Sequence, residues 1–368
     1  MSTIFLDEAA LYDFVVTQGH GIKGLSDLGL TEVPQKCVKP PHQRIEHPNP
    51  TPSQYENKPI DFSRLNGSNY DQQVADQIVH AAENLGFFQV INHGVSVELL
   101  EAIKIVAHKF FQQKPERKVA YARGVSTSPF VKYVTSYNPE KETSWDWRDC
   151  LSLVHTSDAE ALEYWPAECK EIALEYLNKS FKMIRTLLEV LLGKLGVILD
   201  DEKFEDYTGI RLVNLNYYPP CPNPELTNGA CPHSDMGILT VLLQDGVGGL
   251  SVKAGKDIGS LKKGDWIDIP PMDGALVINV GDVLQILSNG RYVSAEHRVR
   301  TTDHARVSVP IFTSPRPSVK IGPLSQTING DGKVYYKEVL LEEYMDNFIN
   351  TVHVGKESLD FVEIKNHP

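Results

Sequence analysis

The feature that most constrains the fold of this chain is a series of short segments with alternating apolar residues after about residue 207. Each segment is six to ten residues long and is bounded by turn-forming residues, which is the pattern of half-buried β-strands. Eight such segments within about 100 residues predict a closed or sandwiched all-β unit. The Asn289–Gly290 pair predicts a hairpin turn. The segments are RLVNLNYY, GILTVLLQ, GGLSVK, DWIDIP, ALVINV, VLQILS, RYVSAEHRVR and RVSVPIFT.

The residues before this region predict mainly helices. Val74 and Ile78, followed by two alanines, form the apolar stripe of an amphipathic helix over 70–85, and Gly86 suits its C-terminal end. The aromatic and β-branched segment FFQVINHG (87–94) predicts a strand. Apolar periodicity predicts further helices in four other ranges: 8–18, 97–112, 168–195 and 338–349.

Helices and strands therefore occupy different parts of the chain, as in an α+β fold. We expect a jelly-roll β core over residues 207–315. A mainly helical N-terminal region, 1–206, would pack against it, and residues 316–368 would form a C-terminal helical extension. At about 150 residues per domain, 368 residues allow two domains, but we expect one composite domain.

Composition excludes several classes of function. The chain has 36 Lys and Arg against 48 Asp and Glu, a net charge of −12, which argues against a protein that follows the nucleic-acid backbone. No apolar run approaches the roughly 18–20 residues that span a membrane, and no basic N-terminal flank marks a signal peptide. The five cysteines form no C-x-x-C pair, so neither a zinc ribbon nor a disulfide framework is expected. We expect a cytoplasmic monomer that binds a small molecule.

The β region contains residues that could bind a metal. His233 and Asp235 are two apart in CPHSDMG, and residues i and i+2 of a strand point to the same face. His297 lies 64 residues later in another expected strand. Two histidines and one carboxylate with open positions are typical of non-haem Fe(II) oxygenases. Zinc could use similar ligands, but a hydrolytic zinc site also needs a general base, and the sequence has no H-E-x-x-H motif.

A second pair of residues suggests what binds beside the metal. Arg306 and Ser308 are also two apart, so a guanidinium and a hydroxyl share one face. Arginine binds a carboxylate through two parallel N–H donors. Tyr218 could donate a third hydrogen bond. Together with a metal, these residues suit a dicarboxylate whose one end chelates the metal while the other pairs with the arginine.

Taken together, these motifs resemble the plant 2-oxoglutarate- and Fe(II)-dependent dioxygenases. The matching segments run in the family's order from about residue 55 to 368. They are GFFQVINHG (86–94), NLNYYPPCPNPEL (214–226), HSD (233–235), LTVLLQD with GGL (239–250), INVGD with LSNG (278–290), EHRV (296–299) and RVSVPIF (306–312).

The resemblance implies a fold, cofactors and site residues. The fold is a double-stranded β-helix, in which His233, Asp235 and His297 bind Fe(II). The co-substrates are 2-oxoglutarate and O2, with ascorbate as reductant, and 2-oxoglutarate is decarboxylated to succinate. The family's 2-oxoglutarate site corresponds to four residues here: Arg306, Ser308, Tyr218 and Asn216. Positions that often line the family's substrate pocket correspond to three: Tyr133, Asn214 and Phe312.

Several segments resemble the branch of this family that acts on coumarins and their precursors. They are LYDFVVTQGHGIKGLSDLGL, SVELLEAIKIVAHKFF, VKYVTSYNPEKETSWDWRD and SAEHRVRTT. The resemblance implies hydroxylation of an aromatic carbon in a phenylpropanoid-derived substrate. That substrate would be a coumarin such as scopoletin or a cinnamoyl-CoA thioester such as feruloyl-CoA.

Three departures from that branch leave the substrate open. Pro232 stands where the branch has Arg, the stretch 254–266 is several residues longer than usual, and the gap from His297 to Arg306 is one residue shorter. The same cofactor chemistry could act on another specialised metabolite, such as an alkaloid or flavonoid, by hydroxylation, demethylation or desaturation. A non-catalytic ligand-binding protein on an oxygenase scaffold is the third alternative.

Overall fold

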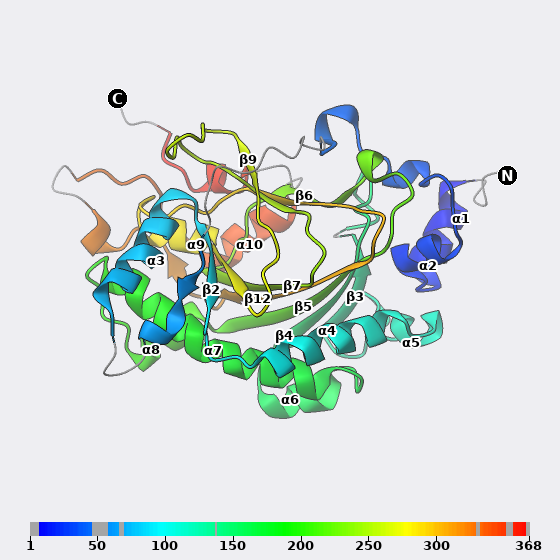
Figure 1. Cartoon of the computed structure of the whole chain (residues 1–368), viewed down its shortest axis with the longest axis horizontal. Helices are drawn as coiled ribbons and strands as arrows, with labels where there is room; N and C mark the ends of the chain where they lie inside the picture. The colour runs from blue at the N-terminus through cyan, green and yellow to red at the C-terminus, as the bar shows by residue number, and fades with distance from the viewer. Residues whose placement is uncertain are drawn as a thin grey trace.

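The computed structural model describes residues 7–45, 58–65, 70–136, 138–328, 332–350 and 356–365. In this part of the chain, two β-sheets lie face to face, and helices cover the outer face of the larger one (Figure 1). The large sheet has the strand order β1-β2-β10-β7-β12-β5-β4-β3, and the small sheet has the order β6-β11-β8-β9. β13 and β14 form a separate two-stranded sheet. The fold is therefore the jelly-roll sandwich with helices that the sequence predicts.

The strands are short, and neighbours in each sheet are often far apart in the sequence. Their bounds are β1 Ile60–Asp61, β2 Phe87–Ile91, β3 Val131–Thr135, β4 Asp149–His155, β5 Ile210–Tyr218, β6 Asn228–His233, β7 Leu239–Gln244, β8 Leu250–Lys253, β9 Trp266–Asp268, β10 Leu276–Val280, β11 His297–Arg300, β12 Arg306–Ser314, β13 Lys320–Ile321 and β14 Val339–Leu340. Except for the parallel pair β1–β2, the strand pairs of the two main sheets are antiparallel.

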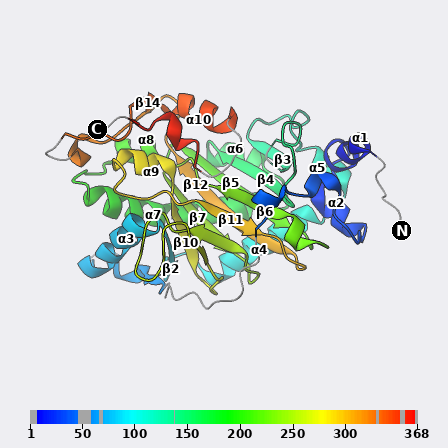
Figure 2. The ribbon, with the colours of Figure 1, turned by 90° about the horizontal axis from the view of Figure 1, so that it is seen from above.

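The helices come mostly from the first half of the chain. Their bounds are α1 Glu8–Tyr12, α2 Gly21–Asp27, α3 Gln72–Asn84, α4 Val97–Phe111, α5 Pro115–Val119, α6 Asp158–Tyr164, α7 Lys170–Gly193, α8 Asp201–Tyr207, α9 Asp282–Leu287 and α10 Leu341–Asn350. A short π-helix, Asp13–Thr17, continues α1. α1 and α2 lie at the β3 end of the large sheet, and α10 lies along another side (Figure 2).

The long helices α4 and α7 cover the outer face of the large sheet. Phe111 of α4 stacks on Tyr217 of β5 with ring centroids 5.3 Å apart. The hydroxyl of Tyr176 in α7 donates a hydrogen bond to the Val309 carbonyl of β12, 3.3 Å away. These contacts leave the opposite, inner face of the sheet free to face the small sheet.

A second apolar cluster fills the space between the two sheets. Phe87, Tyr218 and Val277 reach into it from the large sheet, and Val252 and Val299 from the small one. Each apolar side chain buried in this way contributes about 1.5–3 kcal/mol to folding. These apolar contacts hold the two sheets together. The cluster reaches the predicted metal-binding residues, because the rings of Phe87 and His297 have centroids 5.2 Å apart.

Local signals explain where two of the predicted elements begin or end. The Asp71 side chain caps α3, and the Ser96 side chain caps α4, each by accepting a backbone N–H of the first turn. Gly86 has φ 72°, a left-handed conformation that glycine adopts without strain, and it ends α3 as the sequence predicts.

The segment VLQILS is a helix, and its prediction as a strand is wrong. It forms α9, whose six residues are all buried. A short, mostly apolar run does not distinguish a buried helix from a buried strand. Asn289 and Gly290 therefore follow a helix and form no hairpin, and the Gly290 N–H donates to the Gln285 carbonyl at 2.9 Å. Both have positive φ, as is common after a helix.

Four strands of the large sheet, β1 to β4, come from residues 1–206. The sequence indicates β2, and it places His233 on a strand, which is β6, but it does not indicate β3 or β4. The first half of the chain therefore supplies strands as well as helices, while the division into 1–206, 207–315 and 316–368 stays a prediction. Among the described residues, no helix is both long and apolar enough to cross a membrane.

Candidate metal centre and co-substrate site

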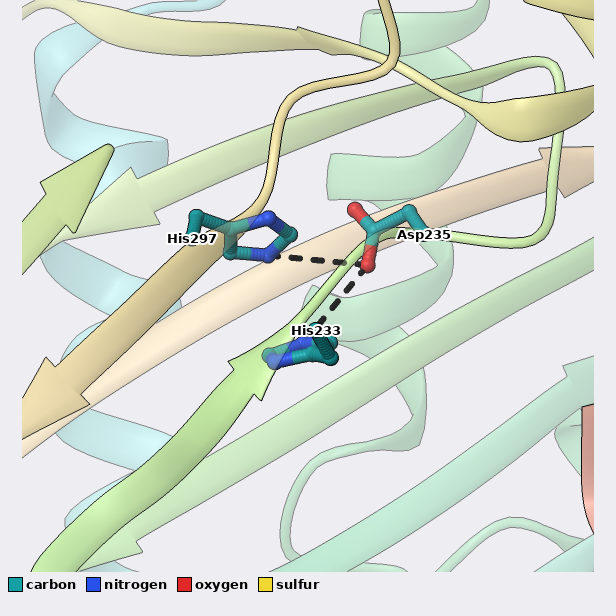
Figure 3. A group of neighbouring side chains, drawn as sticks. All are labelled: His233, Asp235 and His297. Atoms are coloured by element: carbon teal, nitrogen blue, oxygen red, sulfur yellow. Dashed lines mark ion pairs between the residues drawn. The ribbon is translucent and has the colours of Figure 1, made fainter. Parts of the chain in front are cut away.

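The two histidines are direct neighbours on adjacent strands of the small sheet. β6 ends at His233 and β11 begins at His297, and the antiparallel register pairs these two residues directly. Asp235 lies in the loop that follows β6, so the prediction that it shares a strand with His233 is wrong. Its Oδ1 is 3.9 Å from Nε2 of His233 and 3.7 Å from Nε2 of His297 (Figure 3). The potential ligand atoms of all three lie within 4.8 Å of one another.

Hydrogen bonds on the far side of each imidazole leave the ligand atom free. Nδ1 of His233 lies 2.7 Å from the Cys231 carbonyl oxygen, and Nδ1 of His297 lies 3.2 Å from the Ala295 carbonyl oxygen. A carbonyl can only accept, so the ring proton of each histidine is assigned to Nδ1. The lone pair of each Nε2 then points into the site, which is how backbone carbonyls orient metal-binding histidines.

Asp235 is held in the same way. Its Oδ2 accepts hydrogen bonds from the Thr240 hydroxyl, at 2.6 Å, and from the Asn279 side-chain amide. Its other oxygen, Oδ1, is the one that faces both histidines. The side chain is 6% exposed, so these two donors matter, because a buried carboxylate is costly without hydrogen bonds.

The electrostatics of the site favour a neutral imidazole at His233. Burial, with a further contribution from nearby His297, lowers the pKa of His233 to about 4. At neutral pH the ring is therefore uncharged, which is the form that binds a metal ion.

The loop that carries Asp235 packs very closely against the turn before α9. A Cβ atom on Gly281 would collide with the Gly237 carbonyl oxygen, so only glycine fits there. The Gly281 N–H donates to the Ile238 carbonyl at 3.1 Å, and the Asp282 N–H donates to the Asp235 carbonyl at 2.7 Å. These two hydrogen bonds hold the backbone of the Asp235 loop against the start of α9.

Arg306 is a buried cation on the inner face of the large sheet. It is 2% exposed, its Nη2 donates to Gln244 Oε1 at 3.0 Å, and its Nε donates to the Val247 carbonyl at 3.2 Å. Its Nη1 is buried and makes no hydrogen bond, and within the described ranges no carboxylate forms an ion pair with it. The guanidinium carbon lies 4.9 Å from the centre of the Tyr218 ring. A buried charge requires a partner, so this arrangement fits an anionic ligand.

Ser308 and Asn216 lie beside this arginine on the inner face of the large sheet. The register pairs Arg306 with Tyr218 and Ser308 with Asn216. Nδ2 of Asn216 donates to Ser308 Oγ at 3.4 Å, while its Oδ1 is buried without a partner. The four residues predicted to hold 2-oxoglutarate therefore form one compact group.

Two of the three predicted pocket residues share the inner face. Asn214 precedes Asn216 by two positions on β5, and its buried Oδ1 has no hydrogen-bond partner. Phe312 is half-buried on β12, and the register pairs it with Thr240, the residue that supports Asp235. Both can face a substrate placed near the histidines.

Tyr133 lies on the other face of the sheet. It pairs with Leu151, whereas the neighbours of Leu151 on β4 pair with Asn214 and Asn216, so the alternation of β-strands directs Tyr133 outward. Its ring packs against Phe110 of α4 with centroids 6.0 Å apart. This position corrects the expectation that Tyr133 lines the substrate pocket, and we leave it out of the proposed site.

Arg148 is a residue near the site to which the sequence analysis gave no role. Its Nε is buried without a hydrogen-bond partner. The β4–β5 register pairs Asp149 with Tyr217, which places Arg148 next to Tyr218. Burial opposes the charge of Arg148, but Tyr218 and Asp146 more than compensate and raise its pKa. It precedes β4 in the segment WDWRD, which matches a segment of the coumarin branch, yet nothing in the sequence indicated which face it would take.

Two of the three departures from the branch lie in or next to the small sheet. Pro232 is half-buried on β6, directly before His233. The longer stretch 254–266 connects β8 to β9 and is mostly exposed. The shorter gap follows His297 and ends at the first residue of β12. The three metal-facing residues lie together in this chain.

The residues present fit iron and 2-oxoglutarate. Two imidazoles and one carboxylate, gathered on one side, are the donor set of a facial Fe(II) site with open positions. The unpaired Nη1 of Arg306 fits the distal carboxylate of a dicarboxylate.

Comparisons with known proteins agree with this geometry. The model of the 2OG-Fe(II) oxygenase superfamily matches residues 210–315, and that of the "non-haem dioxygenase in morphine synthesis N-terminal" family matches residues 59–172. Scopoletin 8-hydroxylase of Arabidopsis thaliana is 53% identical over 98% of this chain and 99% of its own length. Feruloyl CoA ortho-hydroxylase 2 of the same plant is 43% identical over 98% of both chains.

A solved structure shows the same fold. The crystal structure of JOX2 in complex with 2OG, Fe and JA superposes with a TM-score of 0.79 and 30% sequence identity, covering 93% of this chain and 97% of JOX2. Full-length similarity at this level, together with the His–Asp–His group and the buried arginine, identifies the chain's family. The chain belongs to the 2OG-Fe(II) oxygenase superfamily and is an enzyme that uses Fe(II) and 2-oxoglutarate.

Proposed function

We propose that this enzyme hydroxylates an aromatic carbon of a coumarin, with scopoletin as the first substrate to test. The observation that carries the proposal is the 53% identity to scopoletin 8-hydroxylase over nearly the whole of both chains. The feruloyl-CoA ortho-hydroxylases are less similar, at 42–43% identity. A cinnamoyl-CoA thioester is therefore the second substrate class.

In this proposal, His233, Asp235 and His297 bind Fe(II) through Nε2, Oδ1 and Nε2. Iron and 2-oxoglutarate together supply the oxidising chemistry, in which one oxygen atom of O2 enters succinate and the other enters the substrate. Thr240 and Asn279 hold the carboxylate of Asp235 in place. The protein's contribution is to position the reactants and exclude water from them.

The co-substrate would bind along the inner face of β12 and β5. Arg306 would pair with the distal carboxylate of 2-oxoglutarate through its free Nη1, with Ser308 and Tyr218 as further donors. Asn216 would support Ser308. The organic substrate would then lie next to Phe312 and Asn214, on the same face and nearer to Asp235.

The experiment that tests this proposal is a substrate panel. Purified enzyme is incubated aerobically with Fe(II), 2-oxoglutarate and ascorbate, and receives scopoletin, feruloyl-CoA, p-coumaroyl-CoA and unrelated aromatics in separate reactions. Mass spectrometry measures product with one added oxygen and the succinate formed with it. We expect hydroxylated scopoletin in equal amount to succinate. Product from a CoA thioester alone would contradict the coumarin proposal.

One observation supports a second candidate, the same chemistry on another specialised metabolite. Pro232 lies directly beside a proposed iron ligand, and the β8–β9 connection, which the resemblance implies is longer than in the coumarin branch, is mostly exposed. Differences in pocket shape of about 1–3 kcal/mol are enough to change the preferred substrate. Product from an alkaloid or flavonoid alone would favour this candidate. Iron binding without turnover of any acceptor would favour a non-catalytic scaffold.

The expectations of a monomer and of a cytoplasmic location stay predictions. Size-exclusion chromatography with light scattering tests the first, since a monomer has a mass of 41.1 kDa. Imaging of a fluorescent fusion of the full chain in plant cells tests the second.

A further inference from the structure

Asp282 is a buried carboxylate surrounded by hydroxyl groups close to the proposed iron site. It is 0% exposed and begins α9, at the end of the INVGD segment. Its Oδ1 accepts a hydrogen bond from Ser294 at 2.6 Å. Its Oδ2 accepts from Ser234 at 3.1 Å, from Tyr344 at 2.8 Å and from Ser358 at 3.4 Å. Four donors nearly saturate the lone pairs of one carboxylate.

Two of these donors belong to the segments that carry the metal-binding residues. Ser234 lies between His233 and Asp235, and Ser294 lies three residues before His297. The backbone N–H of Asp282 also donates to the Asp235 carbonyl at 2.7 Å. One aspartate therefore connects two segments that are 60 residues apart in the sequence (234 to 294) and that must stay in register for the three ligand atoms to converge.

The other two donors come from the C-terminal part of the chain. Tyr344 lies in α10, and Ser358 follows it in the described segment 356–365. A parallel contact strengthens the connection, because Nζ of Lys356 donates to Gln285 Oε1 at 3.1 Å. The same oxygen accepts the backbone N–H of Ser294 at 2.7 Å. The C-terminal part thus reaches the segment before His297 by two routes.

We infer that Asp282 is a positioning residue, which holds the two ligand-carrying segments in register and couples them to α10 and residues 356–358. The Asp282 carboxylate accepts hydrogen bonds from the four hydroxyls described above and takes no part in the reaction. The inference rests on the proposed role of His233, Asp235 and His297 as iron ligands. Residues that hydrogen-bond metal ligands directly typically contribute about 10- to 100-fold to metal affinity, and Asp282, whose side chain acts through Ser234 and Ser294, should contribute at the lower end of that range.

The coupling works in both directions. If contacts of the C-terminal part raise the affinity for the metal, then metal binding must stabilise those contacts by the same factor. The amides of α10 should therefore exchange more slowly with deuterium after metal is added, even though α10 contributes no ligand.

The test measures metal affinity in variants of the full chain. Co(II), which does not oxidise during the measurement, is titrated into metal-free protein and its absorption is recorded. The variants are Asp282→Asn and Tyr344→Phe. Tyr176→Phe is the matched control for Tyr344→Phe. Both tyrosines are 0% exposed, and the Tyr176 hydroxyl also donates one hydrogen bond, to the Val309 carbonyl.

We expect Co(II) to bind the wild type, with an affinity about tenfold lower in Asp282→Asn and several-fold lower in Tyr344→Phe. Tyr176→Phe should lower the melting temperature and keep the wild-type affinity. If Asp282→Asn does not fold, Tyr344→Phe and Ser358→Ala carry the test, since each removes a single donor.

Two results would overturn the inference. An unchanged Co(II) affinity in the variants that fold, with only a lower melting temperature, would show that Asp282 supports the fold alone. Unchanged deuterium exchange in α10 after metal binding to the wild type would show that the C-terminal part is not coupled to the site. A wild type that binds no Co(II) would instead overturn the proposed iron site itself, so the two failures are distinguishable.

Discussion

At the scale of single residues, hydrogen bonds decide which atoms the site offers to a ligand. The Nδ1 atoms of His233 and His297 and the Oδ2 atom of Asp235 are all engaged with the protein. Two nitrogens and one oxygen remain on the same side. The sequence pattern identified these three residues but not the atoms that would bind the metal. Those atoms are set by the carbonyls of Cys231 and Ala295, whose positions depend on the folded backbone.

Replacing Arg306 tests the co-substrate site. Arg306→Met removes the buried charge and keeps much of the volume, so we expect KM for 2-oxoglutarate to rise at least about 30-fold. Truncating one member of a buried ion pair costs about 2–5 kcal/mol. Arg306→Lys should give an intermediate value, because lysine keeps the charge and loses the planar pair of donors.

The control for this prediction is Arg117→Ala, which removes an arginine whose side chain is 73% exposed and pairs with Glu168 on the surface. It should leave KM for 2-oxoglutarate unchanged. Steady-state kinetics with varied 2-oxoglutarate measure all three variants. A wild-type KM in Arg306→Met would refute the assignment of this arginine.

His93 gives stability a dependence on pH. Its Nδ1 accepts the Val95 N–H, and its Nε2 lies 3.0 Å from the Gly274 carbonyl oxygen, so the neutral ring is fully bonded. Burial lowers the pKa of His93 below the usual 6.5, and as the pH falls the unfolded chain takes up the proton first. This contribution to stability is therefore present above about pH 6.5 and is lost below it, by at most about 1.4 kcal/mol per pH unit.

The prediction is that His93→Gln loses less stability between pH 7 and pH 5 than the wild type does. Urea unfolding at a series of pH values measures the free energy of unfolding for both proteins. Parallel curves for the two proteins over this range would show that His93 does not contribute.

At the scale of elements, strand register converts distant residues into neighbours. The pairing of β6 with β11 places His233 opposite His297, and the pairing of β5 with β12 places Tyr218 opposite Arg306. The loop with Asp235 then has to approach α9 closely. That approach depends on Gly281, where any side chain would meet the Gly237 carbonyl.

Gly281→Ala should therefore damage the site through the backbone. We expect it to lower the free energy of unfolding by about 1–3 kcal/mol, as overpacking does, and to weaken Co(II) binding. Gly193→Ala is the matched control, because Gly193 is the last residue of α7, a Cβ atom there meets no other atom, and alanine favours the helix. Thermal unfolding and Co(II) titration compare the two variants, and equal behaviour would contradict the close-packing argument.

The elements show which parts of the fold could be predicted from the sequence. Long amphipathic helices such as α3 and α7 were predictable, because 13 and 24 residues carry a clear apolar period. The six buried residues of α9 were not, since so short an apolar run suits either structure. Strands β3 and β4 do alternate apolar residues with Lys132 and Ser152, so they carry the same pattern as the strands that were expected. The outward position of Tyr133 follows from register, which the sequence alone does not define.

At the scale of the whole molecule, the site lies between a large sheet assembled from both halves of the chain and a small sheet from the second half. The first half supplies β3 and β4, next to the strand that carries Asn214 and Asn216, and the second half supplies the proposed metal ligands. The match to the family motifs identified the site residues of the second half. The motif match did not indicate that Arg148 lies near these site residues, because Arg148 comes close to Tyr218 only through the pairing of β4 with β5.

Metal binding should stabilise the whole fold. A ligand that binds only the folded state at 100 times its dissociation constant contributes about 2.7 kcal/mol. We expect Co(II) with 2-oxoglutarate to raise the melting temperature by several degrees and EDTA to reverse the increase. His297→Ala should show little of this increase, and calorimetry compares it with the wild type. An equal increase in both proteins would place the metal elsewhere.

The central claim is that this chain is a 2-oxoglutarate-dependent oxygenase that hydroxylates a coumarin, and the fate of O2 tests it most directly. Enzyme, Fe(II), 2-oxoglutarate, ascorbate and scopoletin are incubated under ¹⁸O₂, and mass spectrometry measures the label in both products. We expect one ¹⁸O atom in succinate and one in hydroxylated scopoletin, in equal amounts. Labelled succinate without labelled coumarin would contradict the substrate, and no labelled succinate with any acceptor would contradict the enzyme class.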